Sequence, residues 1–296
     1  MNKFSDKTSG LLNFMELKKR RYRFLYWTMF AVLVIISLIC VLPAIWVLLS
    51  GFKDAQEFYR IPPALFPEHF KLSKLSEVWQ QLNFLKLYKN SGVIIIGDLI
   101  FNIILNGVMG YVLSRLKPKG TALVGTLIFW SMLLPTSMNL VPLFMGFVDV
   151  PIFHINMTDT YWPMWIMSGA NAFNVLLFRN FFNGIPMSYI EAARIDGCTD
   201  TGIFARIVMP LAKPIIMVVA IFTVQAAWGN FLWPYLIIQD ANKLPIAVKI
   251  YQFKSSGITI DKYMIALMFT IIPPAILFTI FSKHIMGGLN MSGLKG

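Results

Sequence analysis

Six long apolar runs constrain this sequence more than any other feature. They cover about residues 24–49, 92–113, 121–147, 161–179, 211–238 and 263–286. A helix crosses a hydrocarbon core of ~30 Å with about 20 residues, so each run is long enough to span a bilayer. Because the runs are continuous and do not alternate with a period of two, they predict helices and not barrel strands. The sequence therefore predicts an all-α membrane protein with six transmembrane helices.

The composition agrees with a membrane protein, since 14% of the 296 residues are charged and the mean hydropathy is +0.65. The run 24–49 follows a basic segment, as in a signal peptide. It is longer than the apolar part of a typical signal peptide, however, and it lacks a clear small-residue cleavage site. We therefore expect a tail over 1–23, one membrane domain over 24–287 and a second tail over 288–296.

The distribution of Lys and Arg predicts the orientation, because basic residues near the ends of spans are retained in the cytoplasm. With the N-terminus inside, the inner segments hold sixteen of the 26 basic residues and the longer outer segments hold ten. We therefore expect both termini in the cytoplasm, together with the segment 184–210. The net charge of +12 largely reflects this bias, so it does not indicate a nucleic-acid partner.

An amphipathic pattern marks the outer segment 71–89. Its apolar residues recur at helical spacing between charged ones. Two interpretations remain open: a helix that packs on the outer ends of the spans, and a helix that contacts a partner or the membrane interface.

Polar residues within the spans are costly in hydrocarbon unless they face protein or water. Asp98, Asn102 and Asn106 are four residues apart and share one helical face. Ser168, Asn171 and Asn174 share another, and the fifth run carries Gln225, Trp228, Asn230 and Trp233. Amides beside aromatic rings suit a path for a neutral polyhydroxylated solute. The alternative is that these side chains only join helices to one another, and the two tryptophans also fit interfacial anchors.

A compact charged block lies between the fourth and fifth runs, in the predicted cytoplasmic segment. Residues 187–196 are good helix formers, and Gly197 is placed to end that helix in a left-handed conformation. Thr199 is placed to cap a second short helix, and Pro210 and Pro214 follow before the fifth run. The block lacks histidine and has too few carboxylates for a metal site. Its pattern is typical of a short helix that docks into a groove on another protein.

The residues of this block resemble the EAA loop of permeases from ATP-binding-cassette (ABC) importers. The match comprises Glu191, Ala192, Ala193, Asp196, Gly197, Phe204, Ile207, Pro210 and Pro214. Further stretches resemble the carbohydrate-uptake branch, in particular the maltose-type second permease subunit. They are "SGFK" at 50–53, "GYVLSRLKPKG" at 110–120, "LFRNFFNGIP" at 177–186, "WGNFLWP" at 228–234 and the terminal "GGLNMSGLKG".

The resemblance implies the type I importer permease fold, in a bacterial plasma membrane, with a cytoplasmic coupling helix. It implies that Glu191 pairs with a basic residue of an ATPase subunit, that Ala192 and Ala193 allow close approach, and that Gly197 makes the turn. The residues implied to couple to the ATPase are Glu191, Ala192, Ala193, Arg194, Asp196, Gly197, Phe204 and Pro210. Gly293, Lys295 and Gly296 of the C-terminal tail are implied to reach toward the ATPase dimer.

The partners implied are a second homologous permease, a dimeric cytoplasmic ATPase, an extracytoplasmic solute-binding protein and the lipid bilayer. The chain has no G-x-x-x-x-G-K-[ST] motif, so we expect it to be a transport subunit and not an enzyme. We expect it to bind no cofactor itself, with ATP and Mg²⁺ used by the partner ATPase. The expected cargo is an oligosaccharide or sugar derivative. The alternatives are a secondary transporter of a small polar solute and an ABC permease for a non-sugar substrate.

Overall fold

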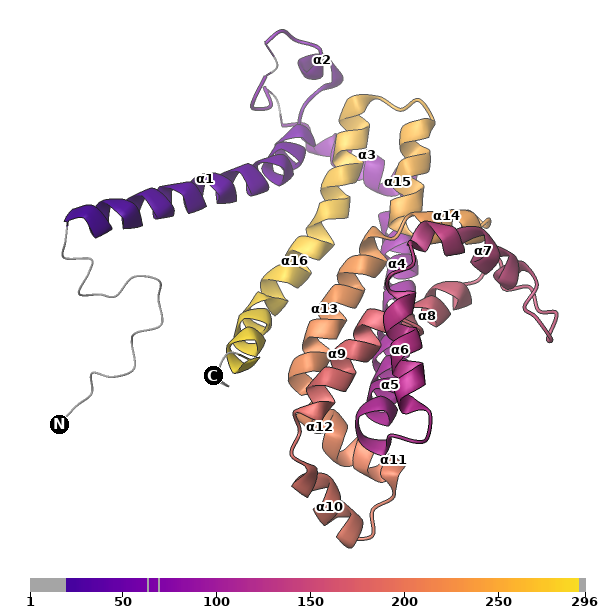
Figure 1. The fold of residues 1–296 in the computed structure, drawn as a ribbon. Helices are drawn as coiled ribbons and strands as arrows, with labels where there is room; N and C mark the ends of the chain where they lie inside the picture. The colour runs from indigo at the N-terminus through magenta and orange to yellow at the C-terminus, as the bar shows by residue number, and fades with distance from the viewer. Residues whose placement is uncertain (1–19, 63, 69, 293–296) are drawn as a thin grey trace.

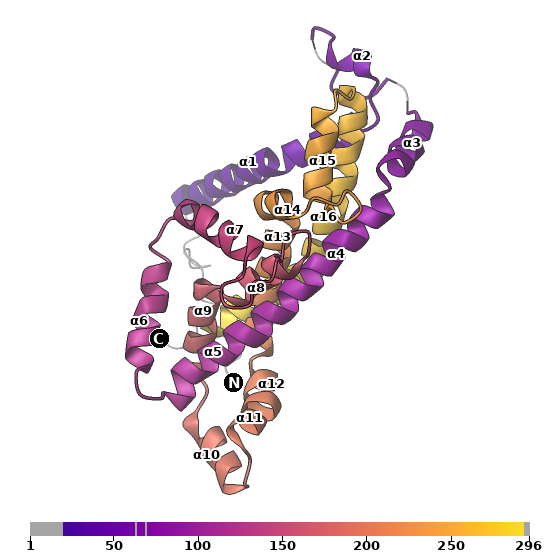
Figure 2. The ribbon, with the colours of Figure 1, turned by 90° about the vertical axis from the view of Figure 1, so that its right-hand side faces the viewer.

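The computed structural model describes residues 20–62, 64–68 and 70–292. Helices make up its regular structure, and the prediction of an all-α fold is confirmed. Figures 1 and 2 show an elongated arrangement in which α10 (Met187–Ile195) and α11 (Asp200–Ile203) lie at one end. At the opposite end lie α2 (Ala55–Phe58), α3 (Leu72–Leu82) and α15 (Ile246–Ser255).

Three helices within the described residues are long and apolar enough to cross a membrane. They are α1 (Arg20–Ser50), the continuous helix Phe84–Leu116 and α16 (Ile260–Ser292). The second comprises α4 (Phe84–Phe101), η2 (Asn102–Asn106), α5 (Gly107–Tyr111) and η3 (Val112–Leu116), where η2 and η3 are π-helical turns. A fourth candidate is α13 (Lys213–Gly229), if it is counted with the segment Asp200–Leu211 from which it is bent by 78°.

The other expected spans contain breaks that the apolar runs did not predict. The run 121–147 is divided into α6 (Thr121–Ser131), the short 3-10 turn η4 (Thr136–Asn139) and α7 (Leu140–Val148). The run 161–179 is divided into α8 (Trp162–Gly169) and α9 (Ala172–Asn183), and α14 (Leu232–Ile237) is separate from α13. Pro135 leads into η4 and the side chain of Asn171 caps α9, so polar and proline residues end these helices.

The first helix, α1, is exposed along its length, and Ser50 is its one buried residue. Its C-terminal end packs against α16 (Figure 1). The apolar side chains of Phe24–Ile45 therefore face outward, as they do in a helix surrounded by lipid.

The outer segment begins a helix at Leu72 and ends it at Asn83, which is left-handed with φ 50°. The second long helix then starts at Phe84, eight residues before the expected start at residue 92. Val78 and Leu82 are buried in a cluster with Ile250 of α15 and Ile265 of α16. In this structure α3 packs on the ends of other helices, which is the first of the two interpretations of its pattern.

Ion pairs join α3 to the segment before α2 and to α16. Lys74 of α3 donates to Asp261 of α16 at 2.6 Å and also to Asp54, which receives a second bond from Lys71 at 2.7 Å. These hydrogen bonds from the two lysines lower the pKa of Asp54 to about 2. Ion pairs thereby hold together three separate segments, which are the residues before α2, α3 and the first turn of α16.

The centre of the molecule is made by α13, which packs against both α4 and α16, and by α5 packed on α9. At Gly110 of α5 a Cβ atom would lie 2.7 Å from Phe178 Cβ and 3.0 Å from the backbone nitrogen of Arg179. A side chain at this position would force α5 and α9 apart. Glycine thus permits the approach of the two helices that connect the middle of the molecule to α10.

Candidate coupling loop and translocation cavity

The charged block forms two short helices joined by a tight turn, at the end of the molecule shown at the bottom of Figure 1. Gly197 has φ 80°, in the left-handed region expected for it, and ends α10. The Thr199 side chain accepts a hydrogen bond from the Gly202 backbone at 3.2 Å and caps α11, as predicted. Arg194 and Asp200 form an exposed ion pair at 3.0 Å across the turn.

One face of this loop is buried in its own chain. Ile190 is completely buried and Ala193 is 5% exposed. Both belong to an apolar cluster, here called the coupling cluster, whose buried members are Tyr111, Phe178, Phe182, Ile185, Ile190, Ala193, Ile203, Val208, Ala212 and Val219. The cluster joins α10 and α11 to α5, α9 and α13, so the loop is anchored to three of the central helices.

The other face of the loop is exposed. Glu191, Ala192, Arg194 and Asp196 lie on it, and Glu191 makes no hydrogen bond or ion pair with the described part of the chain. Ile195 is also on this face and is 86% exposed. Unlike Ile190 and Ala193, Ile195 does not belong to the coupling cluster. An unpaired carboxylate beside an exposed isoleucine is typical of a surface that another protein covers.

Two further residues hold the loop in place. Phe204 is half-buried and its ring lies 5.1 Å from that of Tyr111, so it contacts its own chain, whereas Pro210 is exposed. The Arg115 guanidinium donates to the carbonyl oxygens of Phe182, in the last turn of α9, and of Ile185, just after that helix. The sequence prediction did not include Arg115, although it lies in the stretch "GYVLSRLKPKG" and basic groups favour the carbonyl end of a helix.

A cavity of ≈ 310 Å³ lies among α4, α8, α9 and α13. It contains several of the residues predicted to line a path. Its polar and aromatic lining consists of Asp98, Asn102, Ser168, Asn171, Phe173, Asn174, Phe222, Thr223, Asn230 and Trp233. The two polar groups of the second and fourth expected spans therefore meet at one site, together with Asn230 and Trp233 of the fifth.

Amide groups around this cavity also connect its helices. Asn174 donates to Asn102 Oδ1 at 3.1 Å, and Asn106 donates to the same oxygen at 3.0 Å. Asn106 also donates to the Ser168 carbonyl and accepts from the Asn171 backbone. Asn102 and Asn106 both lie in the π-helical turn η2. Asn102 therefore both joins helices and lines the cavity. Asn106 only joins helices, since it is fully buried and is absent from the cavity lining.

Asp98 differs from these amides. It is 5% exposed, and its Oδ1 is buried and accepts no hydrogen bond from the described residues. Its backbone carbonyl accepts from the Ser168 hydroxyl at 3.2 Å and from the Asn102 backbone within the helix.

Gln225 and Trp228 face a different region. They line a second, apolar cavity of ≈ 520 Å³ between α4, α13 and α16, together with Leu99 and Pro274. The predicted path residues of the fifth run are therefore divided between two faces of the chain, with Asn230 and Trp233 on one and Gln225 and Trp228 on the other.

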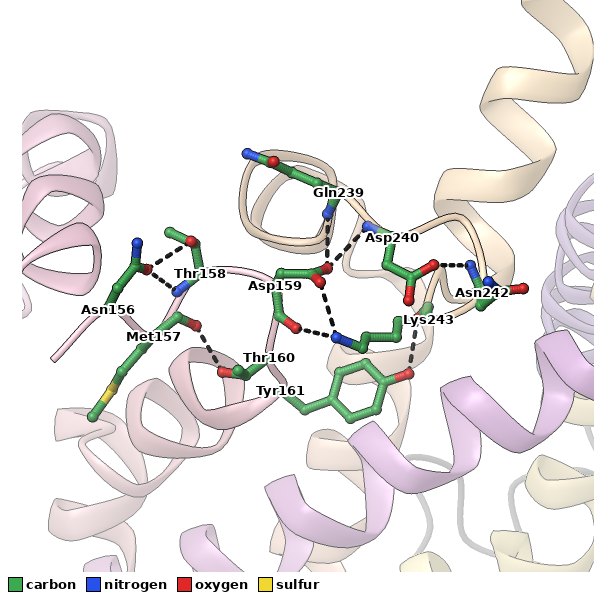
Figure 3. A network of polar contacts seen from close by, with 10 residues as sticks. All are labelled: Asn156, Met157, Thr158, Asp159, Thr160, Tyr161, Gln239, Asp240, Asn242 and Lys243. Atoms are coloured by element: carbon green, nitrogen blue, oxygen red, sulfur yellow. Dashed lines mark hydrogen bonds and ion pairs between the residues drawn. The ribbon is translucent and has the colours of Figure 1, made fainter.

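A network of polar contacts, here called the clasp, joins Asp159 and Tyr161 to the segment 239–243 (Figure 3). Asp159 Oδ1 accepts from the backbone nitrogens of Gln239 at 3.1 Å and Asp240 at 2.9 Å, and Lys243 Nζ donates to Asp159 Oδ2 at 2.9 Å. Tyr161 donates to the Lys243 carbonyl at 2.8 Å. The bonds from the Asp240 backbone and from Lys243 hold the pKa of Asp159 below its usual value. The clasp links the segment before α8 to the segment after α14.

Gly293, Lys295 and Gly296 lie outside the described residues. No group of three or more His, Cys, Asp or Glu side chains arranged to hold a metal ion occurs in the part of the chain that is described.

Comparisons with known proteins agree with this architecture. Residues 94–289 match the family model described as "Binding-protein-dependent transport system inner membrane component". A diacetylchitobiose uptake system permease of Streptomyces coelicolor is 27% identical over 268 residues, covering 90% of this chain and 87% of that protein. A polygalacturonan/rhamnogalacturonan transport system permease of Bacillus subtilis is 29% identical over 281 residues, covering 89% and 96%.

The fold is similar to that of a solved bacterial ABC transporter involved in the import of the acidic polysaccharide alginate. The TM-score is 0.76 at 22% sequence identity, with 90% of this chain and 98% of the other covered. This likeness confirms the predicted ABC importer permease fold. The matched family region runs from the cavity-lining part of α4, through the coupling loop, into α16. The chain therefore belongs to the family of inner membrane components of binding-protein-dependent transport systems.

Proposed function

We propose that this chain is a permease subunit of an ATP-driven importer and that it translocates a carbohydrate across a bacterial plasma membrane. The observation that carries the proposal is the coupling loop, which is anchored on one face by Ile190 and Ala193 and offers Glu191 and Ile195 on the other. Such a loop transmits a push from a docked protein into α5, α9 and α13, because it is packed firmly against them.

The docked protein in this proposal is a dimeric cytoplasmic ATPase, which uses ATP and Mg²⁺. Closure of the ATPase on ATP moves α10, and the helices around the cavity alternate between inward-open and outward-open arrangements. A second, homologous permease completes the path, and an extracytoplasmic solute-binding protein delivers the cargo. Both termini and the coupling loop then lie in the cytoplasm, and the clasp around Asp159 lies outside.

The carbohydrate cargo is supported by the lining of the 310 Å³ cavity, which combines amides, hydroxyls and the ring of Trp233. The printed names of the relatives above, which concern diacetylchitobiose and polygalacturonan or rhamnogalacturonan, support the same class.

Isolation of the intact complex tests this function. A tagged chain is purified from its native membranes in a mild detergent, and the co-purifying proteins are identified by mass spectrometry. We expect an ATPase, a second permease and a solute-binding protein, and the binding protein is then titrated with neutral and acidic oligosaccharides. Recovery without an ATPase would support a secondary transporter. A binding protein that binds only a non-sugar solute would leave the importer intact but change its cargo.

The orientation has its own test. Lys119→Cys is introduced into a chain carrying Cys40→Ser and Cys198→Ser, because Lys119 is exposed and lies outside the coupling loop that the ATPase would cover. A membrane-impermeant maleimide is expected to label this cysteine in inverted vesicles and not in intact cells. If the cells have an outer membrane, it is permeabilised first. Labelling from outside would reverse the proposed topology.

A further inference from the structure

An unpaired carboxylate is the least expected group in the cavity. Asp98 is 5% exposed, and the described residues give its Oδ1 no hydrogen-bond donor. Three amides near it are bonded to one another, since Asn174 and Asn106 both donate to Asn102. A buried carboxylate without a donor costs free energy in proportion to its desolvation. Its retention in the wall of a cavity points to a ligand that supplies the missing donors.

Sugar hydroxyls are suitable donors for the Asp98 carboxylate, which belongs to the wall of the cavity. Asp98 lies four residues, about one helical turn, before Asn102. This spacing places both side chains on the same face of the helix. Neighbouring hydroxyls of a sugar ring donate to a carboxylate and accept from an amide, as in other polar ligand sites. The lining also includes Trp233 and Phe222, and aromatic rings of this kind pack on the apolar face of a sugar. The volume of ≈ 310 Å³ is at the lower end of the range of ligand pockets, about 300–1,000 Å³, and suits one ring of a longer chain.

The charge of the lining restricts the sugar further. Of the described residues around this cavity, none is Lys, Arg or His, so Asp98 is its one ionisable group. A uronate carboxylate would meet a like charge in a poorly solvated site and would find no cation to pair with. An amino sugar would gain an opposite charge there. The hydroxyl pattern alone does not separate these sugars, but the charge does.

We propose that Asp98 forms, with Asn102 and Trp233, a carbohydrate subsite within this subunit that accepts one neutral or amino-substituted sugar ring and rejects uronates. This inference rests on the proposed carbohydrate transport and names its substrate class. It also distinguishes this chain from the solved transporter of the same fold, which is involved in the import of an acidic polysaccharide.

Charged thiol reagents measure the field of Asp98 without knowledge of the natural cargo. Ala226 lines the cavity on α13, four residues before Asn230. Ala226→Cys is made in the full chain with Cys40→Ser and Cys198→Ser, and the complex is kept in its native membranes. Rates of modification by a cationic ethylammonium and an anionic ethylsulfonate methanethiosulfonate are compared. We expect the cation-to-anion ratio to fall about tenfold when Asp98→Asn is added. Asp149→Asn, an exposed carboxylate outside the cavity, is the matched control and is expected to leave the ratio unchanged.

Ligand selection is measured on the same cysteine. Galactosamine, galactose and galacturonate have one ring and differ in charge, and each is added at high millimolar concentration during modification by a neutral methanethiosulfonate. We expect galactosamine and galactose to slow the reaction and galacturonate to leave it unchanged. In the Asp98→Asn chain the difference between galactose and galacturonate is expected to disappear.

Three results would overturn the subsite: a reagent ratio unaffected by Asp98→Asn, no protection by galactose or galactosamine, or protection by galacturonate equal to theirs. None of them depends on ATP hydrolysis or on the binding protein. A chain that shows this protection but recovers no ATPase would contradict the proposed importer and leave the subsite standing. Recovery of the ATPase without protection by galactose or galactosamine would contradict the subsite and leave the proposed importer unaffected.

Discussion

Substitution of Glu191 tests docking to the ATPase with little effect on folding. Its side chain is exposed and unpaired with the described part of the chain, while its neighbour Ile190 is fully buried. Glu191→Ala is expected to weaken assembly with the ATPase by on the order of 2 kcal/mol or more, because the partner's charge would remain buried and unpaired. This corresponds to roughly a thirtyfold loss of affinity in co-purification or binding measurements.

Glu77→Ala provides the matched control for this loss. Glu77 is also exposed, but it pairs with Lys262 at the opposite end of the molecule from α10. Its removal is expected to leave ATPase binding unchanged. Equal ATPase recovery from Glu191→Ala and wild-type membranes would contradict the docking role.

Gly197 allows strain and charge to be separated at one position. A Cβ atom there would meet nothing within 4 Å, so the φ of 80° is the structural constraint on a substitution. Gly197→Asn adds backbone strain of about 1 kcal/mol, because asparagine tolerates the left-handed region better than most residues with a side chain. Gly197→Asp adds a negative charge to the docking surface as well. We expect both variants to insert, Asn to retain most sugar uptake, and Asp to hydrolyse ATP without uptake. Normal uptake by the Asp variant would exclude this turn from the docking surface.

At the scale of elements, the clasp around Asp159 connects the start of α8 to the segment after α14 (Figure 3). Asp159→Asn keeps an acceptor for the Gln239 and Asp240 backbone but turns an amide NH₂ toward the Lys243 ammonium. We expect a loss on the order of 1 kcal/mol at neutral pH, discounted because the Asp159 side chain is 35% exposed. Thermal unfolding of the purified complex measures it, with Asp149→Asn as the control.

The pH dependence of that loss has a definite sign. The folded pKa of Asp159 is lowered, so its contribution is fully present above the ordinary Asp value of about 3.9 and is lost as pH falls through the lower folded value. The melting temperatures of wild type and Asp159→Asn are therefore expected to converge below about pH 4. A difference that stays constant down to pH 3 would show that charge is not the stabilising factor.

The coupling loop and the spans differ in how far sequence predicts them. The α10 boundaries, the turn at Gly197 and the Thr199 cap follow from local backbone preferences and were predictable. The break between α8 and α9 was not predictable from local preferences alone. The Asn171 side chain caps α9, but its backbone nitrogen donates to Asn106 of another helix. The separation of Trp228 from Trp233 was equally hidden, since the interruption after Gly229 changes which face each ring occupies. Hydropathy measures the length of a run and is insensitive to such tertiary contacts.

At the scale of the whole molecule, α9 connects the two sites. Asn171 and Asn174 at its start line the cavity, and Phe178 and Phe182 further along belong to the coupling cluster. Because α9 is 12 residues long, a displacement of α10 reaches the cavity within three to four helical turns. The Arg115 bonds to the end of α9 stiffen this connection. The proposed transmission therefore depends on the packing of the coupling cluster as much as on the docking surface.

Ile190→Ala tests that packing. Truncating this fully buried side chain leaves a void and costs about 2–5 kcal/mol of local stability, so α10 would move without carrying α9 with it. We expect the complex to assemble and hydrolyse ATP while sugar uptake falls several-fold, and Ile190→Val, at about 0.5–1.5 kcal/mol, to give a smaller fall. Ile195→Ala, on the exposed face, is expected to weaken assembly with the ATPase. Each complex that does assemble is expected to show normal uptake. If Ile190→Ala lost the ATPase as Ile195→Ala does, or if the Val and Ala variants transported as well as wild type, transmission through α9 would be excluded. Uptake, ATPase activity and subunit stoichiometry measured on the same vesicles distinguish these outcomes.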